Sequence, residues 1–283
     1  MSIILAYIFY FVAASASPLQ RRWLAVRRDA ESMGQVLFSF QVMLIIALGS
    51  LAFPLFSRFY FSGNSVNLIL LTLVCGVFGA SFFVLNYAAQ KYVDASVTNI
   101  VVNIYTPVAI ILSSIFINEK LTTMQIFGTV LLLLAMVVIS KKHRIGRFTF
   151  DKHFLMMLAS GVMLGVLLVA ERALQKTTGF SAGTMLSWWS QAAFLGLAVF
   201  ITKSRNNYTG KEIWLTGFLR FLQALSWVML VWFVGNLSLV SAITTFKVVI
   251  IFVAAAIFLK EREDIPRKII GCIVAVIGLL LMA

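Results

Sequence analysis

Residues 66–89 read VNLILLTLVCGVFGASFFVLNYAA and contain no charged side chain. An apolar run of this length crosses the ~30 Å hydrocarbon core of a bilayer as a single α-helix. A membrane β-strand would instead alternate apolar and polar residues, and this stretch does not alternate. The stretch therefore predicts a transmembrane helix.

The composition of the whole chain agrees with this stretch. Hydrophobic residues make up 61% of the 283 positions and charged residues 12%, and the mean hydropathy is +0.99. A soluble domain has about a quarter of its residues charged and could not cover this much apolar surface. The sequence predicts an all-α polytopic protein of the plasma (inner) membrane, with the lipid bilayer as its main partner.

Ten apolar runs are long enough to be membrane spans. They cover residues 2–18, 34–56, 66–89, 95–117, 122–140, 153–173, 181–202, 211–234, 238–259 and 266–282. Pro18 and Pro54 lie near the ends of their runs, where a missing backbone donor costs little. Pro107 lies halfway through the fourth run, which predicts a kink there.

The net charge of +13 comes from basic residues that lie mostly between the apolar runs. In this position they act as topology signals and bind anionic lipid head groups, so a nucleic-acid partner is not expected. The loops after the odd-numbered runs hold most of these residues. This bias predicts that odd-numbered loops are cytoplasmic and that both termini lie outside.

The residues that build most metal and catalytic sites are scattered. Cys75 and Cys272 lie inside apolar runs, and His143 and His153 flank a basic loop. This arrangement favours neither a disulfide framework nor a metal site. No nucleophile–base pair or phosphate-binding glycine loop is visible. We therefore expect no cofactor, no metal and no enzymatic activity.

The chain carries a repeated pattern. Residues 105–128 and residues 245–271 both hold an apolar helix, an FxxE turn and a glycine-containing helix, with Glu119 and Glu261 in the two turns. Gln41 and Gln191 occupy matched places earlier in each half. The pattern divides the chain into a repeat over 1–140, a basic cytoplasmic linker over 141–152 and a repeat over 153–283. Five spans per repeat require the two repeats to be inverted in the membrane, as in many secondary transporters.

With these motifs the sequence resembles the EamA-type, ten-helix branch of the drug/metabolite transporter superfamily. The resemblance rests on the stretch from Pro107 through Glu119 to Gly128 and on its partner from Phe258 through Glu261. The second copy lacks the mid-helix proline, and its spacing from glutamate to glycine is one residue longer. The resemblance implies a carrier for a small-molecule substrate that works by alternating access, and we expect it to function as a monomer.

Two charged residues lie deep in the predicted spans. Arg220 and Lys247 are each nine residues into their runs, which places them ~14 Å from a membrane face. An unpaired cation at this depth costs at least ~2.5–3.5 kcal/mol. We therefore predict that both line a central cavity and bind an anionic group of the substrate. The alternative is that both bind backbone carbonyls and helix ends.

Polar and aromatic residues near this depth are further candidates for substrate binding. They are Gln41, Gln191, Asn99, Asn103, Tyr105, Gln223, Trp227 and Trp188. Hydrogen bonding between helices is an equal explanation for the amides. For the tryptophans, packing or an interfacial belt explains the positions better.

Acidic residues are absent from the predicted midplane. Glu171 comes nearest, close to the outer end of its span. Anion exchange or facilitated movement is therefore favoured over a proton relay, which commonly uses a buried acid. Glu119 and Glu261 lie at span ends and, with Pro107, are predicted to act in gating rather than in binding.

Other functions stay open at this stage. One is an exporter of cationic or neutral drugs or amino acids, which would need an acidic or aromatic cage. Another is a membrane accessory protein that transports nothing. A solvated central cavity would favour transport, and a dry packed bundle would favour the accessory role.

Overall fold

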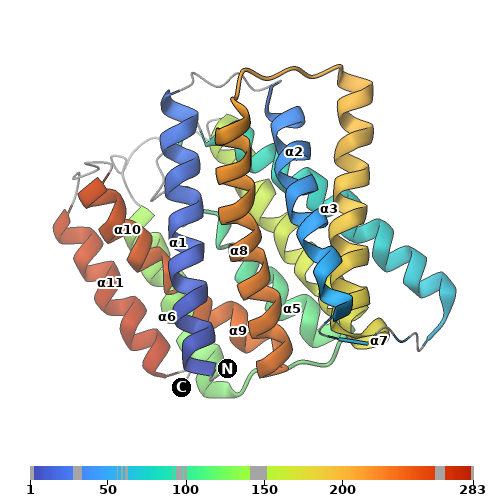
Figure 1. Ribbon diagram of the computed structural model, residues 1–283. Helices are drawn as coiled ribbons and strands as arrows, with labels where there is room; N and C mark the ends of the chain where they lie inside the picture. The colour runs from blue at the N-terminus through green and yellow to red at the C-terminus, as the bar shows by residue number, and fades with distance from the viewer. Residues whose placement is uncertain are drawn as a thin grey trace.

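The computed structural model describes residues 3–27, 34–55, 57–58, 60, 63–90, 92–93, 98, 101–140, 152–258 and 265–281. All regular structure in these residues is helical. In chain order the helices are α1 (Ile3–Arg27), α2 (Gly34–Gly49) with the 3₁₀ turn η1 (Ser50–Leu55), α3 (Ser65–Ala89), α5 (Tyr105–Phe116), α6 (Thr123–Ser140), α7 (Lys152–Thr202), α8 (Gly210–Val234), α9 (Leu237–Thr244), α10 (Lys247–Phe258) and α11 (Ile265–Leu280) (Figure 1). The helix α1 packs along α8, α3 along α7, and α6 along α11.

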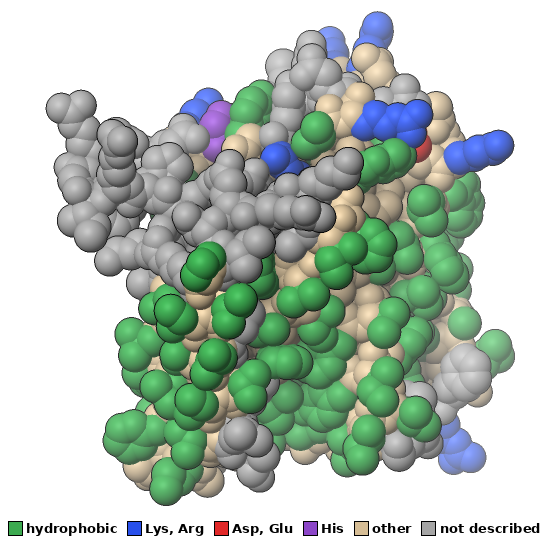
Figure 2. Space-filling model, turned by 90° about the vertical axis from the view of Figure 1, so that its left-hand side faces the viewer, with side chains coloured by type: hydrophobic (Ala, Val, Ile, Leu, Met, Phe, Trp, Pro, Cys, Tyr) green, Lys and Arg blue, Asp and Glu red, His purple; other side chains and the backbone are tan. Residues whose placement is uncertain are grey.

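The outer surface of the bundle is apolar. Six of the described helices are long and apolar enough to cross a membrane. Leu55, Phe200 and Phe258 are each more than three-quarters exposed, and Figure 2 shows hydrophobic side chains over the side of the molecule with Lys and Arg toward its ends. Side chains of this kind are stable where lipid surrounds them. The chain is therefore a multi-pass membrane protein.

The first helix is longer than its hydropathy predicts. The apolar run ends at Pro18, but α1 continues to Arg27 with Pro18 inside it. The prediction that Pro18 marks a helix end is wrong. The extra turns form because Arg21 and Leu24 are buried against the rest of the bundle, and this packing offsets the loss of one backbone hydrogen bond at proline.

The two runs 153–173 and 181–202 form the two arms of α7, which are joined at a sharp break. Residues 174–178, predicted as a loop, stay helical, and the hydroxyl of Thr178 donates to the carbonyl of Leu174 at 2.7 Å. The backbone then leaves helical geometry at Gly179, with φ 83° and ψ 167°. Across this break, Nε2 of Gln175 on the first arm donates to Oγ1 of Thr184 on the second arm at 3.0 Å. The helix α7 therefore folds back on itself as a helical hairpin.

Replacing Gly179 by alanine tests this break. An L-residue rarely adopts φ 83° with ψ 167°, and a Cβ would lie 2.7 Å from Cε1 of Tyr60. We expect Gly179→Ala to lower the free energy of unfolding by about 1–3 kcal/mol. Thermal unfolding of the purified protein measures the effect. Gly210→Ala is the matched control, because a Cβ there meets no atom within 4 Å; equal midpoints for the two variants would contradict the prediction.

Short turns interrupt the helical structure before α5 and before α10. A two-residue turn at Asn103–Ile104 precedes α5, and another at Thr245–Phe246 precedes α10. The kink was predicted at Pro107, but the helix breaks four residues earlier, at Asn103. Pro107 itself lies in the first turn of α5, where its missing N–H is tolerated. Tyr105 and Lys247 are the first residues after the two breaks.

Candidate functional site

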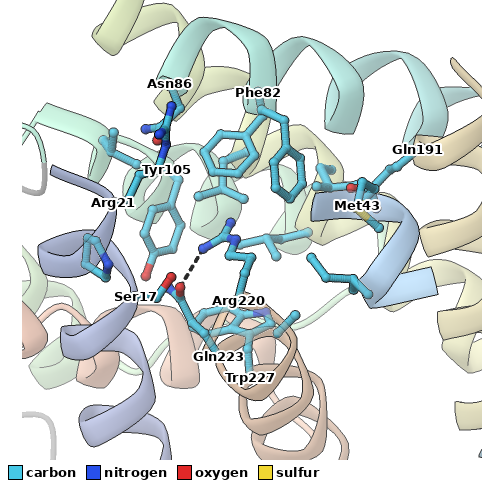
Figure 3. Close-up of a pocket in the computed structure, with 18 of the residues that line it drawn as sticks. Ser17, Arg21, Met43, Phe82, Asn86, Tyr105, Gln191, Arg220, Gln223 and Trp227 are labelled. Atoms are coloured by element: carbon cyan, nitrogen blue, oxygen red, sulfur yellow. Dashed lines mark hydrogen bonds between the residues drawn. The ribbon is translucent and has the colours of Figure 1, made fainter. Parts of the chain in front are cut away.

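A cavity of about 130 Å³ lies at the centre of the bundle, between α1, α2, α3, α5, α7, α8 and α10 (Figure 3). Its wall is largely aromatic and aliphatic. Four charged side chains reach it: Arg21, Glu171, Arg220 and Lys247. The two cations that the sequence places at mid-membrane therefore share one cavity.

Lys247 is held at the break between α9 and α10. Its side chain is 8% exposed. The ammonium donates to the hydroxyl of Tyr10 at 3.3 Å and to the hydroxyl of Tyr105 at 3.2 Å, and it lies 4.7 Å from the centre of the Tyr105 ring. Lysine has three donors, so these tyrosines leave one donor for another acceptor in the cavity.

Arg220 reaches the cavity from the middle of α8. Its Nη1 donates to Oε1 of Gln223 at 2.6 Å (Figure 3). The guanidinium lies 5.3 Å from the ring centre of Phe82 and 5.2 Å from that of Phe83. Its Nε has no partner among the described residues. Among the described residues, no carboxylate forms an ion pair with Arg220 or Lys247.

Most of the other predicted binding residues also line the cavity. They are Gln191, Tyr105, Gln223, Trp227 and Trp188. Trp227 packs against the rings of Tyr10 and Tyr105, at 5.6 and 5.9 Å between centres. It therefore supports the two tyrosines that hold Lys247.

Three predicted binding residues lie elsewhere or cannot be placed. Gln41 is not part of the cavity wall; its Oε1 accepts from Asn206 at 2.8 Å. Asn103 is fully buried beside the helix break, and both its amide atoms lack a partner among the described residues. Asn99 lies outside the described residues, as do Glu261 and most of the 141–152 linker.

Arg21 is a cavity residue that hydropathy assigns to a loop. It is 1% exposed, and its guanidinium lies 4.3 Å from the ring centre of Phe38 and 4.4 Å from that of Tyr87. It also donates to Gln35 and, at 3.3 Å, to Tyr208. These contacts compensate a charge that hydropathy alone counts as solvated. The helical spacing of Tyr10, Ser17 and Arg21 is the signal that identifies it.

Glu171 is the second residue that the sequence reasoning misses. It was expected near the outer end of its span, yet its carboxylate lines the cavity and is 5% exposed. It shares a helical face with Leu164, Leu167 and Leu168, which line the same cavity. This i, i+3, i+4, i+7 spacing is a sequence signal for a common face.

Glu119 forms a closed junction at one end of the bundle. Its Oε1 lies 3.0 Å from Nε of Arg172 and 2.8 Å from Nζ of Lys176. Its Oε2 accepts from the backbone N–H of Leu237 at 2.5 Å, at the start of α9. Arg172 also donates to the carbonyl of Gly235 at 2.8 Å. One carboxylate thus ties the loop after α5 to α7 and to the α8–α9 connection.

The loop after α5, which carries Glu119, and the C-terminal part of α1, which carries Arg21, lie toward opposite ends of the bundle (Figure 1). The loop after α5 is at the lower end of the view, and the C-terminal end of α1 is at the upper end. Arg21 itself lines the cavity, whereas Glu119 does not. The volume of the cavity is below the ~300–1,000 Å³ of typical ligand pockets, so a ligand of ordinary size would fit only if the surrounding helices moved apart.

The chemistry of the cavity is recognition by charge and by hydrogen bonds. Three cations and one acid line it, so its formal charge favours an anion. Within the described residues, no three His, Cys, Asp or Glu side chains converge on a point where they could bind a metal.

Comparison with known proteins supplies a family. Residues 1–141 match the sequence model of the EamA-like transporter family. A crystal structure described only as "Crystal structure of protein" shares the fold with a TM-score of 0.68 and 17% sequence identity, over 98% of this chain and 97% of that chain. No curated protein matches the sequence.

Proposed function

Because the first half of this chain, residues 1–141, belongs to the EamA-like transporter family, we propose that the protein is a secondary transporter of a small organic anion. The substrate binds in the central cavity, and the protein exposes that cavity to the two sides of the membrane in turn. Arg220 and Lys247 bind the anionic group, a carboxylate or a phosphate.

The observation that carries this proposal is the pair of cavity-lining cations, buried Lys247 and partly exposed Arg220, without a carboxylate partner in the described chain. An intramembrane cation that serves only structure is normally paired, because leaving it unpaired costs several kcal/mol. Here hydroxyls, one amide and aromatic rings provide partial compensation. An anionic ligand completes it.

The topology we propose has ten spans in two inverted five-helix repeats, over 1–140 and 153–283. Several features support it. The hairpin α7 supplies two spans, and the breaks before Tyr105 and Lys247 fall at equivalent places in the two halves. The family match ends beside the proposed boundary. The start of α1 and the end of α11 lie at the same end of the bundle (Figure 1), which agrees with termini outside and cytoplasmic odd-numbered loops.

A second candidate is transport of an organic cation. One observation favours it: the carboxylate of Glu171 lies in a cavity with several aromatic side chains, among them Trp188 and Trp227. Such surroundings bind quaternary amines. The three cations of the same wall oppose it, so we place it second.

A thermal-shift screen of the purified protein distinguishes the two candidates. The test compounds are phosphorylated metabolites, organic acids, amino acids and quaternary amines. A ligand present at a concentration 100 times its dissociation constant stabilises the folded state by about 2.7 kcal/mol. We expect stabilisation by phosphorylated metabolites or organic acids. Stabilisation by quaternary amines alone would contradict the anion proposal and favour the second candidate.

A further inference from the structure

The carboxylate of Glu171 has no function in the anion site described above. It is 5% exposed, and its Oε1 has no hydrogen-bond partner among the described residues. The side chains of Ser187 and Trp188, on the second arm of the α7 hairpin, are its polar neighbours. Gln191 Nε2 in turn donates to Ser187 Oγ at 3.0 Å, which links this group to the cavity wall.

No cation neutralises Glu171 in the described part of the chain. Arg172, the next residue, instead pairs with Glu119. On the packed helix α3, Cys75 interacts electrostatically with Glu171 and is fully buried. The remaining titratable and charged groups of the cavity wall are Tyr10 and Arg21 of α1, Tyr87 of α3, Tyr105 of α5, Arg220 of α8 and Lys247 of α10.

We propose that Glu171 is a proton-binding site whose proton is carried together with the anionic substrate. The inference rests on the proposed function, because it needs an anion in the same cavity. The carboxylate takes up one proton when the cavity is open to one side of the membrane. It releases that proton when the cavity is open to the other side, so proton and anion move in the same direction.

The sign of the coupling follows from the charges. An anion bound at Arg220 and Lys247 brings negative charge into a cavity that already holds the Glu171 carboxylate. Like charges in a site of low dielectric disfavour the ionised acid, so anion binding promotes uptake of a proton. Linkage is reciprocal, so the protonated acid binds the anion more tightly than the ionised acid does.

The position of Glu171 revises the expectation, made from the sequence, that transport is not coupled to protons. An acid-relay mechanism was disfavoured there because no acid reached the predicted midplane. The structure puts Glu171 on the cavity wall, so coupling to a proton gradient becomes compatible with anion transport.

Sulfate is a suitable probe, because its charge stays constant across neutral pH. Calorimetry in buffers of different ionisation enthalpy counts the protons taken up on binding. We expect about one proton per sulfate in the wild type and none in Glu171→Gln. The wild-type affinity should fall up to about tenfold per pH unit as pH rises, whereas Glu171→Gln should keep a high affinity that does not change with pH.

Infrared difference spectra of the same proteins in lipid nanodiscs identify the group that takes up the proton. Added sulfate should produce a protonated carboxylic-acid band in the wild type that Glu171→Gln lacks. Glu212→Gln, which changes a half-buried acid of the α8 capping box outside the cavity wall, is the matched control and should behave as the wild type.

The outcomes separate the two proposals. Sulfate binding without proton uptake, or with uptake that persists in Glu171→Gln, overturns the coupling and leaves the anion site intact. Absence of sulfate binding by the wild type and by Glu171→Gln at every pH overturns the anion site, and the coupling with it.

Discussion

Lys247→Met and Arg220→Met should each strongly reduce anion transport by the reconstituted protein while leaving its expression and folding intact. Methionine keeps most of the side-chain length and volume but removes the charge. A hydrogen bond to a charged group contributes about 1.5–3 kcal/mol, so each substitution should weaken anion binding about 10- to 100-fold. Flux into proteoliposomes measures transport, and the thermal-shift assay measures binding by the same samples.

Lys211→Met is the matched control, because Lys211 is an exposed lysine in the first turn of α8, on the same helix as Arg220. It should transport as the wild type does. Unfolding midpoints close to that of the wild type would separate lost binding from lost structure. Normal flux through both cavity variants would contradict the proposed role of Arg220 and Lys247.

The position of Arg220 and Lys247 on the cavity wall could be predicted from sequence, because it follows from their depth in the apolar runs. Counting residues along an apolar run gives that depth within a turn or two, and charge at the midplane is costly enough to be informative. Their partners could not be predicted. Tyr10 and Lys247 are 237 residues apart in sequence, and nothing in a single sequence reports that their helices meet.

Arg21 and Glu171 show a different limit. Hydropathy assigns a charged residue near the end of a run to the loop, since it treats every charge as solvated. Arg21 is instead enclosed by the rings of Phe38 and Tyr87, and Glu171 faces a cavity rather than lipid. Whether each of these two side chains is buried depends on which face of its helix points inward. The i, i+3, i+4 spacing of their neighbours holds that information, but the span boundaries do not.

Glu119 was predicted to act in gating, and the structure shows how many contacts its carboxylate makes. A carboxylate at a span end is expected to make a cap or turn interaction. The structure adds two cations of α7 and the first N–H of α9 to that cap. This carboxylate therefore links three separate segments at one end of the bundle, and its loss should affect the closed state more than loss of a helix cap would.

We expect Glu119→Gln to destabilise that closed junction. Arg172 and Glu119 are both 7% exposed at the side chain, and removing one partner of a buried pair costs about 3–5 kcal/mol. Lys176 is 40% exposed, so its pair contributes less. The variant should unfold at a lower temperature and should open more often at this end.

Opening can be measured with a cysteine reporter. Ser238 is fully buried, and its hydroxyl donates to the carbonyl of Glu119 at 2.9 Å. In a background with Cys75→Ser and Cys272→Ser, Ser238→Cys should react with a maleimide only when the junction opens. A cost of 3 kcal/mol converts to labelling on the order of 100-fold faster when Glu119→Gln is added.

The matched control is Glu212→Gln, because Glu212 also accepts from a backbone N–H, that of Thr209 at 2.8 Å, but at the other end of the bundle. It should leave labelling of Ser238→Cys unchanged. Equal labelling rates with and without Glu119→Gln would show that the ion pairs do not hold this end closed. In that case closure would rest on packing alone, and the buried charge of Arg172 would need another explanation. Faster labelling confined to Glu119→Gln would instead identify this carboxylate as the group that every opening of that end must release.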